Sequence, residues 1–368
     1  MRPIAICPVP VALAATLMLS GCAPATMRVD TMPVACENGP TSAAVTWIEP
    51  ERARDRAILA AWCGAVGRVH THRPSPEAPA VALAAVSSSA SGTATARTAP
   101  ARASGNEGGG VVTGNRPLII VSWNTGVGQG RLVEFVSSLR AAEQDTDLVV
   151  LVQEAYRAGE VPAVCTDGTR RATRIRPPPG ALPIDEAAAA LDMHALYVPS
   201  MRNGRDCSEL PHEDRGNAIL STLPLDEAAA IELPHAQQRR VAVAATIRIG
   251  TRAIRVVSVH FDTWRGRRRQ AKGLVDGLRR LPARDAVIIG GDFNQVGFGA
   301  GVRHLRRHFT EARCGGGATH GFPAFRLDRL FTSGLDAAVR CTTADDAHGS
   351  DHWPLIVRLD PPAKSIPD

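Results

Sequence analysis

The chain has 368 residues, of which 44% are hydrophobic and 21% charged, and its formal net charge is +6 at pH 7. The part that follows Arg116 is long enough to bury a core by itself, which excludes a small fold held together only by disulfides or metals. Arginine supplies nearly all of the positive charge, because Lys272 and Lys364 are the only lysines. Such a bias follows overall composition and does not by itself indicate a nucleic-acid-binding protein.

Residues 1–22 have the pattern of an export signal. Arg2 precedes an apolar stretch from Val9 to Leu19, and the sequence Leu19-Ser-Gly-Cys22 follows. This pattern predicts a signal peptide rather than a membrane-spanning helix. Leu-Ser-Gly-Cys resembles a bacterial lipobox, which implies cleavage before Cys22 and lipidation of its thiol. Ala23, where an aspartate would retain a lipoprotein in the inner membrane, favours the outer membrane. The alternative is an ordinary cleaved signal in which Cys22 has no role.

Two further segments precede the main domain. Residues 23–73 form a small N-terminal segment with one predicted helix at Pro50–Val66, where apolar residues recur at helical spacing. Residues 74–115 are rich in Pro, Ala, Ser, Thr and Gly and contain almost no aromatic or large aliphatic residues. Such a composition cannot bury enough apolar surface to fold, so we expect a flexible linker.

The cysteines indicate disulfides in an exported chain. Once the signal is removed and Cys22 is assigned to lipid, an even number remains. Six cysteines allow 15 pairings, and sequence alone cannot select one. A zinc site is the alternative, although no Cys-x-x-Cys spacing supports it. We expect sequential pairing: Cys36 with Cys63, Cys165 with Cys207, and Cys314 with Cys341.

The remaining residues, 116–362, alternate strand and helix patterns. Helical spacing predicts helices at Arg131–Gln144 and Arg265–Leu281, and residues Ala181–Leu191 permit a third. Strands interleaved with a few helices indicate an α/β domain with packed sheets. Besides the apolar runs described next, we expect strands at Ala218–Thr222, Val241–Ile249, Ile254–His260, Ala286–Gly290, Leu327–Phe331 and Leu355–Leu359.

Several apolar runs end in polar residues that suit metal and phosphate chemistry. Buried strands of an α/β protein usually carry the functional residues just beyond their carboxyl ends, so these polar residues should meet at one site. The runs and the polar residues that end them are Leu118–Asn124, Leu148–Glu154, Val256–His260 and Val287–Asn294, with Gly349–His352 late in the chain.

The order of these motifs resembles the endonuclease/exonuclease/phosphatase superfamily. That resemblance implies an α/β fold of two packed β-sheets flanked by helices, the four-layer DNase-I-like sandwich, over residues 116–362. Each motif alone is a weak or moderate signal, but the set in this order is strong. The matching motifs are Ser122-Trp-Asn124, Gln153-Glu154, Gly216–Ser221, Ser258-Val-His260, Gly291-Asp-Phe-Asn294, Arg326-Leu-Asp328 and Ser350-Asp-His352.

Hydrolysis of a phosphoester requires neutralisation of charge on the phosphoryl oxygens, and oxygen ligands holding Mg²⁺ provide it. By the resemblance, Glu154 is a direct metal ligand, Asn124 lies beside it, and Asp351 is the second carboxylate near the metal. Mn²⁺ and Ca²⁺ are alternatives to Mg²⁺. The alternative for Glu154 is a solvated residue at a strand end.

The resemblance assigns proton chemistry to five residues. Asp292 would orient or deprotonate the attacking water, and Asn294, expected on the same side of an extended segment, would donate to phosphate. The alternative for this pair is a turn formed by the Asp and the Asn. Asp328 would hold one imidazole nitrogen of His352, raise its pKa and leave the other nitrogen to donate to the phosphoryl oxygens. His260 stands where DNases and sphingomyelinases carry a second histidine and abasic-site endonucleases carry tyrosine.

A phosphate-contacting pair is expected at Arg215 and Asn217, with turn residues before a strand as the alternative. Arginines also cluster at residues 170–176, 265–269 and 303–307. They could follow a nucleic-acid backbone, face solvent, or meet anionic lipid headgroups.

We therefore expect a metal-dependent phosphodiester hydrolase, an exported lipid-anchored endonuclease whose substrate is nucleic acid. We expect a monomer without a protein partner, attached to the membrane only through its N-terminal lipid. One alternative is a phosphatase or a phospholipase- or sphingomyelinase-type phosphodiesterase of the same superfamily. The other is an inactive binding module, which would leave the occupied catalytic positions unexplained.

Overall fold

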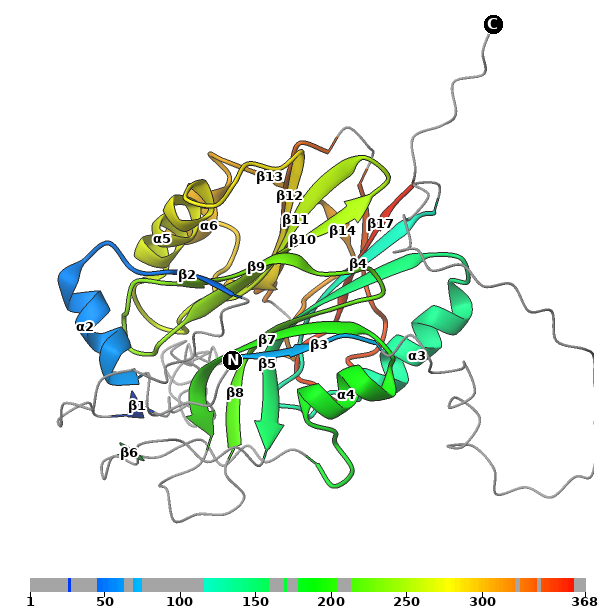
Figure 1. The fold of residues 1–368 in the computed structure, drawn as a ribbon, viewed down its shortest axis with the longest axis horizontal. Helices are drawn as coiled ribbons and strands as arrows, with labels where there is room; N and C mark the ends of the chain where they lie inside the picture. The colour runs from blue at the N-terminus through cyan, green and yellow to red at the C-terminus, as the bar shows by residue number, and fades with distance from the viewer. Residues whose placement is uncertain are drawn as a thin grey trace, which may run out of the picture.

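The structure is a computed structural model that describes residues 26–27, 45–62, 69–74, 116–158, 169–170, 178–203, 213–321, 325–335 and 339–360. Two mixed β-sheets pack face to face, and helices cover their outer faces (Figure 1). This arrangement confirms the predicted fold class. A separate antiparallel pair joins β1 (Thr26–Met27) to β6 (Thr169–Arg170).

The first sheet has eight strands in the described part of the chain. Its centre is the parallel pair β4 and β5, and every other pair is antiparallel except β14 with β16. The order across the sheet is β14 (Cys314–Gly315), β16 (Arg340–Thr343), β17 (Leu355–Leu359), β4 (Leu118–Asn124), β5 (Asp147–Ala158), β8 (Glu213–Ser221), β7 (His194–Asn203) and β3 (His70–His72).

The second sheet has seven strands in the same described ranges. A parallel pair, β11 and β12, lies near its centre, and an antiparallel strand flanks each member of that pair. The order is β13 (Thr310–Glu311), β15 (Asp328–Ser333), β12 (Ala286–Asp292), β11 (Arg252–His260), β10 (Val241–Ile249), β9 (Asp226–Glu232) and β2 (Thr46–Ile48).

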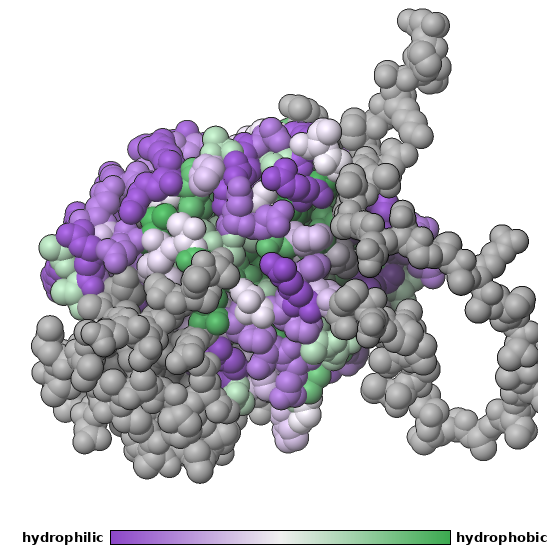
Figure 2. All heavy atoms as spheres, viewed as in Figure 1, coloured by the Kyte–Doolittle hydropathy of each residue, from purple (hydrophilic) through white to green (hydrophobic). Residues whose placement is uncertain are grey.

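Three apolar clusters make the layers. The largest fills the space between the sheets, where aliphatic strand residues such as Leu151 and Val256 are fully buried. Helices α3 (Leu132–Ala142) and α4 (Ile184–Ala190) cover the outer face of the eight-stranded sheet. Helices α5 (Arg267–Arg279) and α6 (Ala300–Leu305) cover the outer face of the other sheet. Figure 2 shows mostly hydrophilic residues on the outer surface around α5 and α6.

Residues of the predicted N-terminal segment complete both sheets. Strand β2 pairs in parallel with β9, and β3 pairs with β7, so residues 46–72 supply an edge strand to each sheet. Helix α2 (Ala53–Trp62) lies between these two strands in the sequence, where a helix was predicted over 50–66. The described part of the segment therefore belongs to the folded body, with one edge strand in each sheet.

Most predicted elements occur close to their expected positions, including β4, β10 and β17, whose bounds agree residue for residue. Strands β7 and β9 were not predicted. Pro199 interrupts the strand pattern of β7, and the register shifts there. The Ala- and Glu-rich β9 has low intrinsic strand propensity, but its pairing with β2 and β10 overrides it.

The disulfide Cys314–Cys341 joins β14 to β16, as predicted. Cys22, the pairs Cys36–Cys63 and Cys165–Cys207, residues 1–22 and nearly all of the predicted linker lie outside the described residues. Within the described ranges, no helix is both long and apolar enough to cross a bilayer.

Candidate active site

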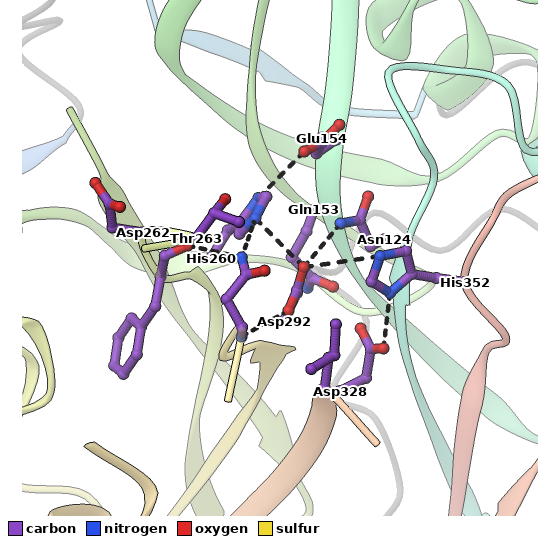
Figure 3. A network of polar contacts seen from close by, with 12 residues as sticks. Asn124, Gln153, Glu154, His260, Asp262, Thr263, Asp292, Asp328 and His352 are labelled. Atoms are coloured by element: carbon purple, nitrogen blue, oxygen red, sulfur yellow. Dashed lines mark hydrogen bonds and ion pairs between the residues drawn. The ribbon is translucent and has the colours of Figure 1, made fainter. Parts of the chain in front are cut away.

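Strand ends from both sheets bring six of the predicted site residues together: Asn124, Glu154, His260, Asp292, Asp328 and His352 (Figure 3). Three of them lie in one lateral row, because His260 is the register partner of Asp292 and Asp292 is the register partner of Asp328. His260 and Asp292 end parallel strands, as expected. Asp328 instead begins β15, and His352 precedes β17. Both strands run antiparallel to their neighbours, so their starting ends reach the same edge of the sheets.

Asp292 is the hub of the polar network. Its Oδ2 accepts a hydrogen bond from Asn124 Nδ2 at 3.1 Å and lies 3.3 Å from His260 Nε2 and 3.8 Å from His352 Nε2. Its Oδ1 accepts from the backbone N–H of Asn294 at 2.8 Å. Burial raises the pKa of Asp292 to about 6, and Asp328 adds to the rise, while His352 opposes it. A carboxylate with such a pKa is suited to accept a proton near neutral pH.

His352 and Asp328 form the predicted pair. His352 Nδ1 donates to Asp328 Oδ2 at 2.8 Å, and both side chains are buried. Burial alone would lower the pKa of His352, but the charges of Asp328, Asp292 and Asp351, with the hydrogen bond to Asp328, raise it to about 10. The indole N–H of Trp123 donates to the backbone carbonyl of His352 and fixes its position. The imidazole is therefore charged at neutral pH, with Nε2–H directed toward Asp292.

His260 and Asn294 support the opposite side of Asp292. Asn294 Nδ2 lies 3.0 Å from His260 Nε2 and donates to the carbonyl of Phe261 at 3.0 Å. Burial, then the charges of Arg240, His352 and Arg215, hold the pKa of His260 well below its ordinary value. The ring is therefore neutral, so Nε2 can accept from Asn294 while Nδ1 carries the proton.

One geometric expectation about Asn294 was wrong. We expected Asp292 and Asn294 to face one side through strand alternation, but Asn294 has a φ of 51° and lies beyond the strand. The residues come together because the Asp292 carboxylate accepts the Asn294 N–H and closes a turn. Between them, Phe293 turns into the core, where its ring stacks edge-on against Phe261 and Phe331.

Glu154 reaches the site through an irregularity in β5. The register between β5 and β8 shifts between Val152 and Ala155, and Glu154 has a φ of 52°. A left-handed conformation costs a non-glycine residue roughly 1–2 kcal/mol, and such strain is often found at functional sites. The Glu154 oxygens lie 3.8 Å from Arg215 Nη1 and 3.8 Å from His260 Nδ1, beyond hydrogen-bond distance.

The metal prediction fits the donor chemistry of this edge. Asp351 is 58% exposed, and its described ion-pair contact, to His320 Nε2, is 3.7 Å long. Asn124 Oδ1 accepts from the Gly126 N–H, and a Cβ placed on Gly126 would lie 3.3 Å from Asp351 Oδ1. Carboxylate oxygens without tight protein partners suit a hard divalent cation. Among the described residues, two groups have ligand atoms within 4.8 Å of one another: His320, Asp351 and His352, and Asp292, Asp328 and His352. Asp351 belongs to the first group, and Glu154 belongs to neither.

Asn217 makes a contact within the protein. Its Nδ2 donates to the carbonyl of Val241 at 2.6 Å, and the side chain is buried. Arg215 is buried too, and its Nε has no hydrogen-bond partner. The predicted phosphate contact of this pair stays a prediction, and the structure shows that Asn217 also ties β8 to the start of β10.

Sequence reasoning missed three contributors. Arg240 is buried, its Nε has no hydrogen-bond partner, and its pKa falls to about 10 because of burial. Gln153 donates to Ser258 Oγ at 3.0 Å and bridges the two sheets directly below the site. The His320 ring packs against His352 with centroids 4.7 Å apart. Gln153 and Ser258 stand within the matched motifs, whereas no local pattern points to Arg240 or His320.

Comparisons with known proteins agree with this geometry. The profile described as "Endonuclease/Exonuclease/phosphatase family" matches residues 121–352, more than half of the chain. The chain belongs to this family. The described residues include groups able to hold a metal.

Individual relatives are more distant. The uncharacterized protein YbhP of Escherichia coli K12 is 28% identical over 165 residues, which cover 40% of this chain and 64% of that protein. An endonuclease/exonuclease/phosphatase family protein from Leptotrichia buccalis C-1013-b shares the fold, with a TM-score of 0.50, 16% identity, and coverage of 66% of this chain and 99% of that one. Sphingomyelinase C from Streptomyces griseocarneus aligns with a TM-score of 0.46 and 17% identity over 67% of this chain and 100% of its own.

Proposed function

We propose that the protein is a Mg²⁺-dependent endonuclease that hydrolyses phosphodiester bonds of nucleic acid. The observation that carries the proposal is the arrangement around Asp292, where a buried carboxylate with a raised pKa lies between a neutral His260 and a charged His352. The Asp292 carboxylate can accept a proton, and the charged His352 beside it can donate a hydrogen bond. Together they suit in-line attack of water on a phosphodiester.

In the proposed reaction, Asp292 accepts a proton from the attacking water as the water oxygen forms the new bond to phosphorus. The leaving oxygen departs with the electron pair of the broken P–O bond and takes up a proton from solvent water. His352 Nε2–H donates a hydrogen bond to a phosphoryl oxygen, and Asp328 keeps the imidazole charged and oriented. Asn124 and Asn294 hold Asp292 in place. Glu154, Asp351 and Asn124 would hold Mg²⁺, which supplies charge neutralisation at the phosphoryl group.

Nucleic acid is the proposed substrate for two reasons. The chain is cationic, and arginines lie next to the site residues on the loop after His260. An anionic polymer gains affinity from such charges through counterion release. The signal pattern of residues 1–22 supports a further proposal, that the enzyme is exported and anchored to the outer membrane by lipid on Cys22.

The test uses the chain without residues 1–22, which keeps β2 and β3 with the rest of the fold. It is incubated with plasmid DNA, RNA, a lipid phosphodiester and phosphomonoesters, in Mg²⁺ or in EDTA. The His352→Ala variant is compared with His308→Ala, whose ring is exposed after α6. We expect Mg²⁺-dependent cleavage of nucleic acid that His352→Ala abolishes and His308→Ala retains.

Other outcomes would separate the alternatives. Turnover of only the lipid diester or the monoesters would move the protein to the phospholipase or phosphatase class. Absence of activity on every substrate, with the fold intact by circular dichroism, would support a binding module.

A further inference from the structure

Two exposed aromatic side chains border the candidate active site. Among the described residues, Trp264 is 41% exposed and Phe298 77% exposed, which is unusual in a chain whose other described large hydrophobics are mostly buried. Each follows a site residue by four positions, since Trp264 comes after His260 on the loop beyond β11, and Phe298 comes after Asn294 on the loop beyond β12. Because β11 and β12 are parallel neighbours, both loops leave the same edge of the sheet.

Arg267 holds the two loops together. Its Nη1 donates to the carbonyl of Thr263 at 2.6 Å and to the carbonyl of Asn294 at 2.5 Å. Figure 3 shows Asp262 and Thr263 directly beside His260. Through Arg267, the loop that carries Trp264 is thus fixed to Asn294, whose side chain also contacts His260.

The backbone of both loops is fixed by further contacts. The carboxylate of Asp262 is fully buried and accepts the N–H groups of Gln237, Gln238, Trp264 and Arg265. In the other loop, Arg306 donates to the carbonyl of Gly297, and Gln295 accepts the N–H of Gly301. The exposed rings therefore stand on ordered loops, which lowers the entropic cost of binding a partner.

The surroundings of the rings are cationic. Arg265 and Arg268 are exposed, and neither has an ion-pair partner within the described part of the chain. The nearest acidic group in the sequence, Asp262, is turned inward, where its carboxylate accepts hydrogen bonds from four backbone N–H groups. This border, which we call the aromatic rim, is defined by Trp264, Arg265, Arg268 and Phe298.

The composition of the aromatic rim distinguishes between two kinds of partner, a lipid bilayer and single-stranded nucleic acid. A bilayer-inserting surface needs a continuous apolar patch, whereas Trp264 is followed by Arg265 and Phe298 stands between two glycines. Isolated aromatic rings beside free arginines are instead the arrangement that binds single-stranded nucleic acid, through stacking on bases and attraction of phosphates.

We propose that the aromatic rim stacks an unpaired base next to the scissile phosphodiester, so that the enzyme prefers single-stranded over duplex nucleic acid. This inference rests on the proposed nuclease function and specifies its substrate. The site residues act on the phosphodiester, and the rim supplies affinity and position for the adjoining nucleoside.

The decisive substrates are two oligonucleotides of equal length and charge. One is an oligothymidylate, and the other has tetrahydrofuran abasic units that keep the phosphates and lack the bases. We expect the Trp264→Ala/Phe298→Ala double variant to lose roughly 10- to 100-fold in kcat/KM on oligothymidylate, mainly through KM, since stacking contributes on this order per base. Its rate on the abasic oligomer should stay near that of the wild type.

The matched control is Leu182→Ala, because Leu182 is also 41% exposed and lies just before α4, far along the chain from the rim. It should behave as the wild type on both oligomers. A Trp264→Phe variant should recover most of the stacking, which distinguishes recognition from a folding defect. Thermal unfolding of each variant completes the control.

Three results would overturn the inference. Equal losses on both oligomers would show that the rings support the site and not a base. A loss confined to binding of anionic phospholipid vesicles would assign the rim to a membrane surface. Faster wild-type cleavage of duplex than of single strands would exclude the stated preference. If the wild type cleaves neither oligomer and hydrolyses a lipid diester, the proposed nuclease function fails together with the proposed role of the aromatic rim. The three results above leave the nuclease function standing, so failure of the rim proposal alone can be told from failure of both.

Discussion

The two halves of the candidate site differ in how tightly the protein holds them. Asp292, Asp328 and His352, the buried half, are at most 5% exposed; a hydrogen bond joins His352 to Asp328, and Asn124 donates one to Asp292. Glu154 and Asp351, the open half, have side chains 19% and 58% exposed, and their ion-pair contacts within the described residues are no shorter than 3.7 Å. A buried charge costs much free energy unless it is paired, so the buried half must be fully organised by the fold.

The difference indicates a division of labour. The groups proposed to move or hold protons are fixed before any substrate arrives, which is what electrostatic preorganisation requires. The carboxylates proposed to hold Mg²⁺ keep oxygens without tight protein partners and can bind a cation with part of its water shell. Substitutions in the buried half should therefore alter the rate of the chemical step, and substitutions in the open half should alter the affinity for the metal.

The largest effect is expected from Asp292→Asn. The substitution removes the proposed proton acceptor, and loss of a general base typically costs about 10²–10⁴-fold in rate. Steady-state kinetics at saturating Mg²⁺ should show this loss in kcat. Asp285→Asn, just before the other end of β12, is the matched control and should retain the wild-type kcat. An active Asp292→Asn enzyme would remove Asp292 from the mechanism.

A smaller effect, on metal binding, is expected from Glu154→Gln. A neutral amide is a weaker ligand for Mg²⁺ than a carboxylate, so the apparent Kd should rise at least about 10-fold, while Asp328→Asn should leave it nearly unchanged. Isothermal titration of Mg²⁺ into each variant measures this. Glu186→Gln, exposed on α4, serves as the control. Equal weakening by Asp328→Asn would contradict the division between the halves.

The smallest effect concerns folding stability against pH, measured in EDTA. The pKa of His352 is raised to about 10 in the folded state, so the stabilisation is complete below about pH 6.5, the ordinary histidine value, and is lost as the pH rises toward 10. Hydrogen bonds to charged groups contribute about 1.5–3 kcal/mol, which sets the expected size.

Urea unfolding at pH 6 and pH 10 tests this for the wild type and His352→Gln. The free energy of unfolding of the wild type should fall across this range by more than that of the variant. A parallel decline in both proteins would show that the pair with Asp328 does not hold the proton.

The buried half could be predicted largely from sequence. Asn124, His260 and Asp292 end buried strands, and the matched motifs also supplied Asp328, which begins β15, and His352, which precedes β17. The predictions worked because strand periodicity and short motifs are local signals. The turn at Asn294 was only the alternative prediction, because it depends on one side-chain hydrogen bond rather than on a repeating pattern.

Other features depend on contacts far apart in the sequence. Strands β2 and β3 have three residues each, too few to show periodicity, and they pair with β9 and β7 more than 100 residues away. Arg240 stands in an arginine-rich chain, where one buried guanidinium cannot be told from its exposed neighbours. His320 joins the site through contacts with Asp351 and His352, which lie some 30 residues further along the chain. Local sequence patterns do not indicate such long-range contacts.

The most direct test of the division between the halves is the rate of single-turnover cleavage of a fluorescent single-stranded oligonucleotide across a range of Mg²⁺ concentrations. We expect Glu154→Gln to shift the midpoint to higher Mg²⁺ with a plateau closer to that of the wild type. We expect Asp328→Asn to lower the plateau by about 10²-fold or more without moving the midpoint. Identical shifts in both variants, or wild-type cleavage that persists in EDTA, would contradict the account.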